Sequence, residues 1–342
     1  MLMTTEIAIV FVATLLLGFF LDNFAHRENK PVSLGSAVGW SIFWIVVAIG
    51  FGVYLHFRHS PEMASLYFTG YALEKALSVD NLFVIMAVFS WFAIPDHLRH
   101  RVLFWGIIGA VVFRGIFVAI GTSLLHLGPW VELLFAGIVI YTAFLMLKAG
   151  DDDDEIEDYS THPAYRFVQK FMPVWPKLHG KNFIVTRREI ESMPENERPE
   201  GWSLPAKGFR FATPMLLCLA VIEFSDVMFA FDSVPAVIAV SKEPLIVYSA
   251  MMFAILGLRS LYFVLEAMKK YLVHLEKAVI VLLFYIGAKL GLNASEPMLN
   301  HGIHIDSGTS LLVVLAILTL GVVASFIFPE KDDEAAEAPS NK

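Results

Sequence analysis

The chain has 342 residues, of which 57% are apolar and 17% are charged, whereas soluble proteins carry about 25% charged residues. This composition excludes a soluble globular protein and a disordered chain, and the single cysteine, Cys218, excludes a disulfide-linked scaffold. A net charge of −8 argues against nucleic-acid binding, so the remaining class is a polytopic membrane protein in contact with lipid.

Apolar runs of about 20 residues mark membrane-spanning helices, because a hydrocarbon core of about 30 Å needs that length. The sequence predicts an all-α polytopic membrane protein with nine such spans: Thr5–Phe24, Gly35–His56, Leu66–Phe92, Val102–Leu125, Trp130–Lys148, Ala212–Val240, Pro244–Ala267, Leu275–Leu292 and Ser307–Phe328. The third and sixth spans are long and contain acids, so either could be broken into two pieces.

Residues 1–148 are expected to hold the first five spans and residues 212–328 the last four. The segment 149–211 is too charged to enter lipid, and 329–342 is expected to be a disordered tail. Lys and Arg are concentrated in the loops that follow odd-numbered spans, and such loops face the cytoplasm. The N-terminus is therefore predicted outside, and the 149–211 loop and the C-terminus inside.

The third to fifth spans resemble the sixth to eighth. The ordered landmarks of the first set are matched in the second: Glu74, Asp80 and Arg114 by Asp226, Asp232 and Arg259. Because an offset of three spans reverses the direction in the membrane, the pattern predicts a three-helix inverted repeat. This arrangement is typical of secondary transporters, whose binding site lies between the repeats.

Acids within the spans are costly, because inserting a carboxylate at mid-bilayer costs about 2.5–3.5 kcal/mol. We expect them to face one another or a wet cavity. On a continuous helix, Glu74, Ser78 and Asn81 share one face. Pro235 cannot donate a backbone hydrogen bond, so a break between Asp232 and Pro235 is expected to free carbonyl oxygens beside the carboxylate.

These groups are hard oxygen donors, which suit Mn²⁺, Mg²⁺ or Ca²⁺ better than zinc or copper. The predicted metal ligands are Glu74, Asp80, Asn81, Glu223, Asp226 and Asp232, with Ser78 and Ser225 as weaker neutral candidates. None of the 11 histidines lies in either acidic motif. A negative pocket also argues against direct binding of an anion.

Other interpretations stay open. The acids could pair with Lys75, Arg114 or Arg259 and be structural, or they could relay protons. Glu132 and Glu276 begin spans and are expected to be interfacial. The acidic run 151–158 could attract cations or dock a basic partner, in which case the protein would be a membrane anchor for cytosolic stress-resistance proteins, without transport.

Familiar catalytic motifs are missing from the sequence. It contains no nucleophile elbow, P-loop, Rossmann fingerprint or zinc-protease motif. We therefore expect neither enzymatic activity nor a tightly bound cofactor, and any transport must be driven by gradients.

The segments Gly70–Val84, Val221–Ala236 and Phe253–Arg259 resemble the motifs of the TerC family. The resemblance runs from the first span to the ninth, and the stretch 151–160 makes the chain similar to the tellurium-resistance branch. It implies a bacterial inner-membrane protein of the LysE-like transporter group, manganese efflux with Mn²⁺ as the transported substrate, and a link to tellurite resistance.

The resemblance also implies specific roles for residues. The six predicted ligands are the family's acidic-motif residues, and Asp22 matches the acid of the family's first span. Cytosolic tellurite-resistance proteins are the partners expected at the 151–158 run.

Overall fold

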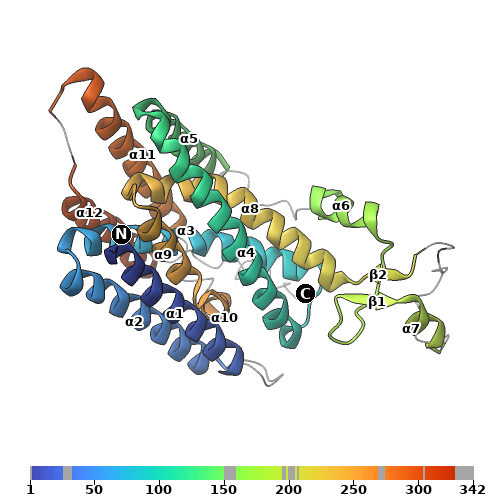
Figure 1. The fold of residues 1–342 in the computed structure, drawn as a ribbon. Coiled ribbons are helices and arrows are strands. Elements are labelled where there is room, and N and C mark those ends of the chain that lie inside the picture. The colour runs from blue at the N-terminus through green and yellow to red at the C-terminus, as the bar shows by residue number, and fades with distance from the viewer. Residues whose placement is uncertain are drawn as a thin grey trace, which may run out of the picture.

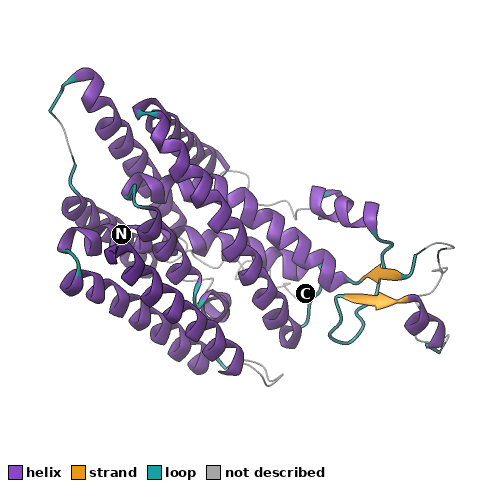
Figure 2. Ribbon diagram, in the orientation of Figure 1, coloured by secondary structure: helices purple, strands orange, loops and turns teal. Residues whose placement is uncertain are grey.

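The computed structural model of the chain describes residues 2–25, 33–149, 159–194, 198, 205, 208–268, 274–302 and 305–327. Within them, long helices form a bundle from which a smaller polar segment projects (Figure 1). Figure 2 shows that the only strands drawn belong to a short ribbon in that segment. The predicted all-α membrane architecture agrees with this fold.

The bundle contains α1 (Leu2–Ala25), α2 (Leu34–Arg58), α3 (Pro61–Trp91), α4 (Asp96–Leu124), α5 (Pro129–Ala149), α8 (Pro214–Val240), α9 (Pro244–Ile255), α10 (Leu258–Met268), α11 (Leu275–Leu299) and α12 (Ser307–Ile327). A short 3₁₀ turn, η1 (Leu125–Leu127), extends α4. Side chains such as Leu16, Ile42 and Leu312 are exposed on the bundle's outer faces, as expected of a surface that contacts lipid.

Six of the described helices are long and apolar enough to cross a membrane: α2, α4 with η1, α5, α8, α11 and α12. A seventh span results if α9 and α10, which meet at 51°, count as one bent helix. α1 has a shorter apolar stretch, Thr5–Leu21, and α3 carries several charged residues. The protein is thus a multi-pass membrane protein, while the count of nine spans and the inverted repeat stay predictions.

Helix starts follow local sequence signals. The Ser60 side chain accepts a 3.1 Å hydrogen bond from the Met63 N–H and Pro61 occupies the first turn, so α3 begins there. α8 also begins with a proline in its first turn, Pro214, but the Thr213 hydroxyl at its cap donates to the carbonyls of Asn182 and Phe183 instead of capping the helix. These two helices carry the acidic motifs, so the positions of their first turns fix where the acids lie along the bundle.

α3 lies at the centre of the helix packing and contacts α2, α8, α9 and α12. Its close approach to α8 and α9 depends on Gly70. A Cβ atom at that position would lie 3.2 Å from both Val237 and Ala250, which is tighter than ordinary contacts. The absence of a side chain at Gly70 therefore lets the first acidic helix lie directly against the second.

The break predicted at Asp232–Pro235 is wrong, because α8 continues through Pro235 to Val240. Val234 and Val237 on either side of the proline are 2% and 1% exposed, so packing holds the backbone helical despite the lost hydrogen bond. α3 is unbroken as well. The bend lies in the seventh predicted span instead, at Gly257, whose φ of +81° ends α9.

The polar segment between α5 and α8 contains η2 (Tyr159–Thr161), α6 (Pro163–Phe171), β1 (Ile184–Thr186), α7 (Arg187–Ser192) and β2 (Arg210–Ala212). The strands are antiparallel and pair Val185 with Phe211. Trp175 and Ile190 pack against that pair and complete a small separate core. This segment therefore holds folded structure of its own beside the bundle.

Candidate functional site

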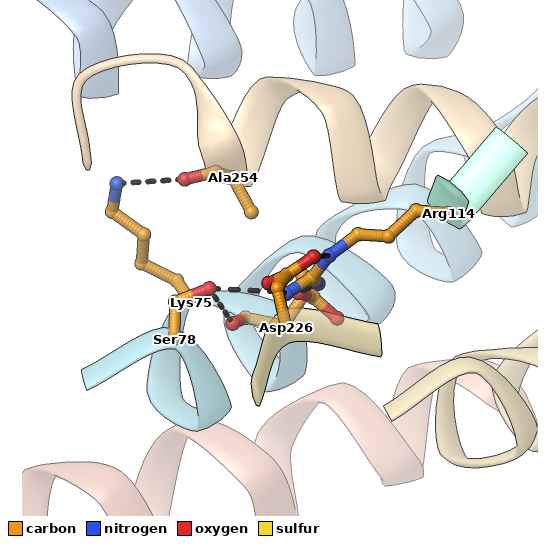
Figure 3. Close-up of polar contacts among 6 residues, drawn as sticks. Lys75, Ser78, Arg114, Asp226 and Ala254 are labelled. Carbon is orange, nitrogen blue, oxygen red and sulfur yellow. Dashed lines mark hydrogen bonds and ion pairs between the residues drawn. The ribbon is translucent and has the colours of Figure 1, made fainter. Parts of the chain in front are cut away.

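Arg114 on α4 joins acids from two distant segments of the chain. Its guanidinium forms an ion pair with Glu74 on α3, and its Nη2 donates a 2.8 Å hydrogen bond to Oδ1 of Asp226 on α8. Arg114 is 1% exposed and Glu74 is completely buried. Figure 3 shows Arg114 reaching from its helix toward Asp226. Two of the predicted metal ligands are therefore paired with the same buried guanidinium group.

Two neutral side chains on α3 lie next to the Glu74–Arg114–Asp226 cluster. The Ser78 hydroxyl donates to the backbone oxygen of Glu74 at 2.7 Å and lies 3.5 Å from its Oε1. The Asn81 amide satisfies its neighbours when its oxygen accepts from Arg114 Nη2 and its nitrogen donates to the Leu77 carbonyl, both at 3.2 Å. Glu74, Ser78 and Asn81 thus lie on one side of α3, as their spacing predicts.

Glu223 lies less than one turn before Asp226 on α8 and packs against the backbone of α4. A Cβ atom at Gly109 would overlap with the Glu223 carboxylate, so glycine makes room for it. Oε2 of Glu223 is buried and has no hydrogen-bond partner among the described residues. Glu223 therefore belongs to the same α4–α8 interface but stays outside the Arg114 pairs. Ser225 turns back on its own helix and donates to the Val221 carbonyl at 2.9 Å.

Lys75 points away from the acids. Its ammonium group donates a 3.0 Å hydrogen bond to the carbonyl oxygen of Ala254, in the last turn of α9 (Figure 3). The last carbonyls of a helix lack intrahelical partners and favour a cation. Lys75 therefore stabilises the end of α9 beside the bend, and pairing between Lys75 and Glu74 is not what the structure contains.

A small cavity of about 40 Å³ lies between α3, α4, α8 and α10. Its lining is mostly apolar, with Asp226 and Arg259 as the charged members. Asp226 is therefore next to a small internal space, whereas Glu223 does not line this cavity.

Several predicted residues cannot be placed in this way. The side chains of Asp22, Asp80, Asp232 and Glu276 and the whole 151–158 run lie outside the described residues. Among the residues that are described, no group of three or more His, Cys, Asp or Glu side chains is arranged to hold a metal ion. The described part of the site is therefore an arginine-bridged pair of acids with Glu223 beside it.

Two features of the site region were missed from the sequence. Glu132 is 8% exposed, and its Oε1 accepts a 2.7 Å hydrogen bond from the ammonium group of Lys242, a pairing that the sequence did not indicate. Gly109 was not singled out, although Gly106 and Gly109 form a small-residue pair on α4 that signals close helix packing. The two glycines of α4 were the feature of the sequence that could have predicted its close contact with α8.

Comparison with known proteins extends the family resemblance. The family model described as "Integral membrane protein TerC family" matches residues 59–333. The chain is 63% identical over 333 residues to the tellurium resistance protein TerC of Serratia marcescens, covering 96% of each chain. Identity to the protein of the same name from an Alcaligenes species is 62% over 331 residues, covering 96% of this chain and 95% of the relative.

A more distant relative also aligns over most of its length. An uncharacterised membrane protein of Rickettsia felis is 33% identical over 302 residues, covering 88% of this chain and 91% of the relative. No solved structure matches the chain. The family match takes in both acidic helices, α3 and α8, and the bent α9–α10 pair. The chain therefore belongs to the TerC family of integral membrane proteins.

Proposed function

We propose that the protein is a secondary transporter that exports Mn²⁺, or a similar hard divalent cation, across a bacterial inner membrane. The observation that supports this function is the pairing of buried Glu74 and partly buried Asp226 with one buried guanidinium between α3, α4 and α8. Each carboxylate inside the bilayer costs about 2.5–3.5 kcal/mol on insertion scales, so a purely structural role would be an expensive one.

We infer that Arg114 takes the place of the transported cation when the site holds no metal ion. Its positive charge compensates the two acids while no metal ion is bound, which keeps them from being buried as bare anions. A divalent cation supplies the same compensation with more charge and accepts oxygen ligands that a guanidinium cannot bind. In this proposal the ion takes over Glu74 and Asp226 when Arg114 turns aside.

Most of the remaining candidate ligands come from the same two acidic helices, α3 and α8. Asn81 and Ser78 lie beside Glu74, and Glu223 lies beside Asp226 with one carboxylate oxygen unpartnered. Asp80 and Asp232 complete the proposed set, with Asp22 and Ser225 as further candidates. All are oxygen donors, which favours Mn²⁺, Mg²⁺ or Ca²⁺ over softer metals. The proposal includes neither an enzymatic activity nor a resident cofactor.

A link to tellurite resistance belongs to the same proposal, because two relatives above 60% identity are named tellurium resistance proteins. In the rival hypothesis, the protein anchors cytosolic tellurite-resistance proteins through the 151–158 run. That run lies outside the described residues, so the geometry gives the rival no support. Replacing 151–158 by a neutral linker separates the two, because only the anchor hypothesis requires loss of resistance with metal flux intact.

The function is tested by uptake of Mn²⁺, Mg²⁺, Ca²⁺ and Zn²⁺ into inside-out vesicles containing the purified protein. We expect uptake of Mn²⁺, weaker uptake of the other hard cations and little of zinc. Vesicles that accumulate none of the four ions above the level of protein-free vesicles would contradict the proposal.

A further inference from the structure

α6 is a short helix that is fixed to the bundle at one end. His162 caps its first turn, where its ring accepts a 3.3 Å hydrogen bond from the Ala164 N–H, and the same ring lies edge-on to Phe224 of α8 at 5.2 Å. Tyr165 stacks on Phe92, near the end of α3. α6 therefore lies beside the N-terminal half of α8, on the side of the bundle from which the β1–β2 ribbon also projects (Figure 1).

The apolar face of α6 is wider than the surface it packs against. At 100° per residue, Ala164, Val168 and Tyr165 form the packed side, and Phe167 and Phe171 continue the apolar face beyond it. The two phenylalanines are 63% and 71% exposed, and their rings contact each other at 4.8 Å. Two of these five apolar residues on α6 are thus left uncovered by the part of the chain that the structure describes.

This uncovered face is continuous with the outer surface of the bundle. Phe167 lines an open groove of about 470 Å³ together with Phe113 of α4 and Phe224 of α8. Phe113 and Phe224 are 38% and 37% exposed on helices apolar enough to span the membrane. The apolar surface of α4 and α8 therefore continues over Phe167 and, through the contact between their rings, over Phe171. Because lipid covers the outer faces of membrane-spanning helices, we expect lipid to cover these two phenylalanines as well.

The opposite face of α6 is basic. Arg166 and Lys170 are exposed and lie one turn apart, with Gln169 on the same polar side, next to Arg166. A short helix with aromatic residues on one side and cations on the other fits the boundary between acyl chains and headgroups. Lipid phosphates are the anions that lie at that depth, and each nearby cation gains about 1 kcal/mol at a negatively charged leaflet.

We propose that α6 is an in-plane interfacial helix that binds anionic phospholipid. Phe167 and Phe171 enter the acyl-chain boundary, and Arg166 and Lys170 contact headgroup phosphates. The helix attaches the polar segment to the leaflet next to the groove that contains Glu223. This inference is independent of the proposed transport function.

The orientation of α6 is tested by spin labelling of the full chain in lipid nanodiscs. Cys218→Ala removes the native thiol, and Phe171→Cys or Gln169→Cys introduces one label on each face of the helix. We expect the label at 171 to be accessible to oxygen, which partitions into lipid, and protected from a water-soluble nickel chelate. The label at 169, the matched control, is expected to show the reverse order.

Two outcomes would overturn the orientation. Equal access of the nickel chelate to both labels would place α6 in water. Protection of the label at 171 from both reagents would mean that protein covers it, as in contact with a second copy of the chain.

The charge requirement is tested by amide hydrogen exchange of residues 163–171 in zwitterionic nanodiscs and in nanodiscs containing an anionic lipid. We expect slower exchange with the anionic lipid, and loss of that difference in Arg166→Gln/Lys170→Gln. The pair Lys181→Gln/Arg188→Gln removes the same charge from exposed positions around the β1–α7 segment and is expected to keep the difference. Exchange that is identical in the two lipids for the unsubstituted chain would contradict anionic lipid binding.

Discussion

Nη2 of Arg114 and Oδ1 of Asp226 lie 2.8 Å apart, although 112 residues separate the two side chains in sequence. Asp226 retains 17% exposure while Arg114 is almost fully buried, so the pair lies at the edge of a buried network. Glu74 shares the same guanidinium from the other side. One arginine therefore links the two acidic helices, and its removal affects both at once.

Arg114→Gln is expected to destabilise the protein by about 3–5 kcal/mol, because it leaves buried carboxylates without their cation. The measurement is thermal or denaturant unfolding of the purified protein in detergent. The control is Lys242→Gln, which leaves one buried carboxylate, Glu132, without its cation instead of two and removes the ammonium group of a side chain that is 64% exposed, so the loss should be smaller.

The double variant Arg114→Gln/Asp226→Asn should be more stable than Arg114→Gln alone, since one of the two unpaired carboxylates has been replaced by a neutral amide. If Arg114→Gln unfolds no more easily than Lys242→Gln, the buried bridge does not carry the stability assigned to it.

Gly109→Ala is expected to reduce cation flux while leaving stability nearly unchanged. The new Cβ would overlap with the Glu223 carboxylate, which is the flexible end of a side chain and can move aside. The matched control is Gly137→Ala on α5, where a Cβ meets nothing within 4 Å. Flux and melting temperature are measured on both variants, and equal flux would remove Glu223 from the transport site.

Gly257→Ala is expected to destabilise the bend between α9 and α10 for two reasons. Its φ of +81° strains an L-residue by about 1–2 kcal/mol, and the new Cβ would lie 2.6 Å from Cδ1 of Trp44. Gly302→Ala provides the control, because its φ is +70° but its Cβ enters open space. The loss in melting temperature should be clearly larger at 257, and equal losses would show that contact with Trp44 contributes nothing.

Glu189 should make the stability of the β1–α7 segment depend on pH. Hydrogen bonds from the Thr186 N–H and hydroxyl, both 2.7 Å, lower the pKa of the Glu189 carboxyl. A carboxyl with a lowered folded-state pKa stabilises the fold above its unfolded pKa of about 4.3, and this contribution is lost as the pH falls through the folded value.

The measurement is amide exchange of residues 184–192 in the unsubstituted chain and in Glu189→Gln at matched pH. The difference should be largest near neutral pH and should disappear on acidification. Glu191→Gln, which removes an exposed carboxylate paired with Arg187, is the control. A difference at Glu189 that persists unchanged at acidic pH would contradict the assignment.

The sequence was sufficient to find the acidic helices, because Glu74 and Asp226 stand out in apolar runs where charge is costly. It left the bridging role of Arg114 open among several pairings, since the choice depends on how α4 lies between α3 and α8. The break predicted at Pro235 was wrong because packing on both sides overrides the local preference. The bend at Gly257 could not be predicted from the sequence, because a single glycine in an apolar run does not indicate that its φ is positive.

The central claim, that the buried acids form a cation path, is tested most directly by Mn²⁺ uptake into inside-out vesicles containing Glu74→Gln or Asp226→Asn. Glu132→Gln is the matched control, since it removes a buried acid that pairs with Lys242 away from Arg114. We expect uptake to be lost in the first two variants and retained in the third. Uptake by Glu74→Gln and Asp226→Asn at the rate of the unsubstituted protein would contradict the account.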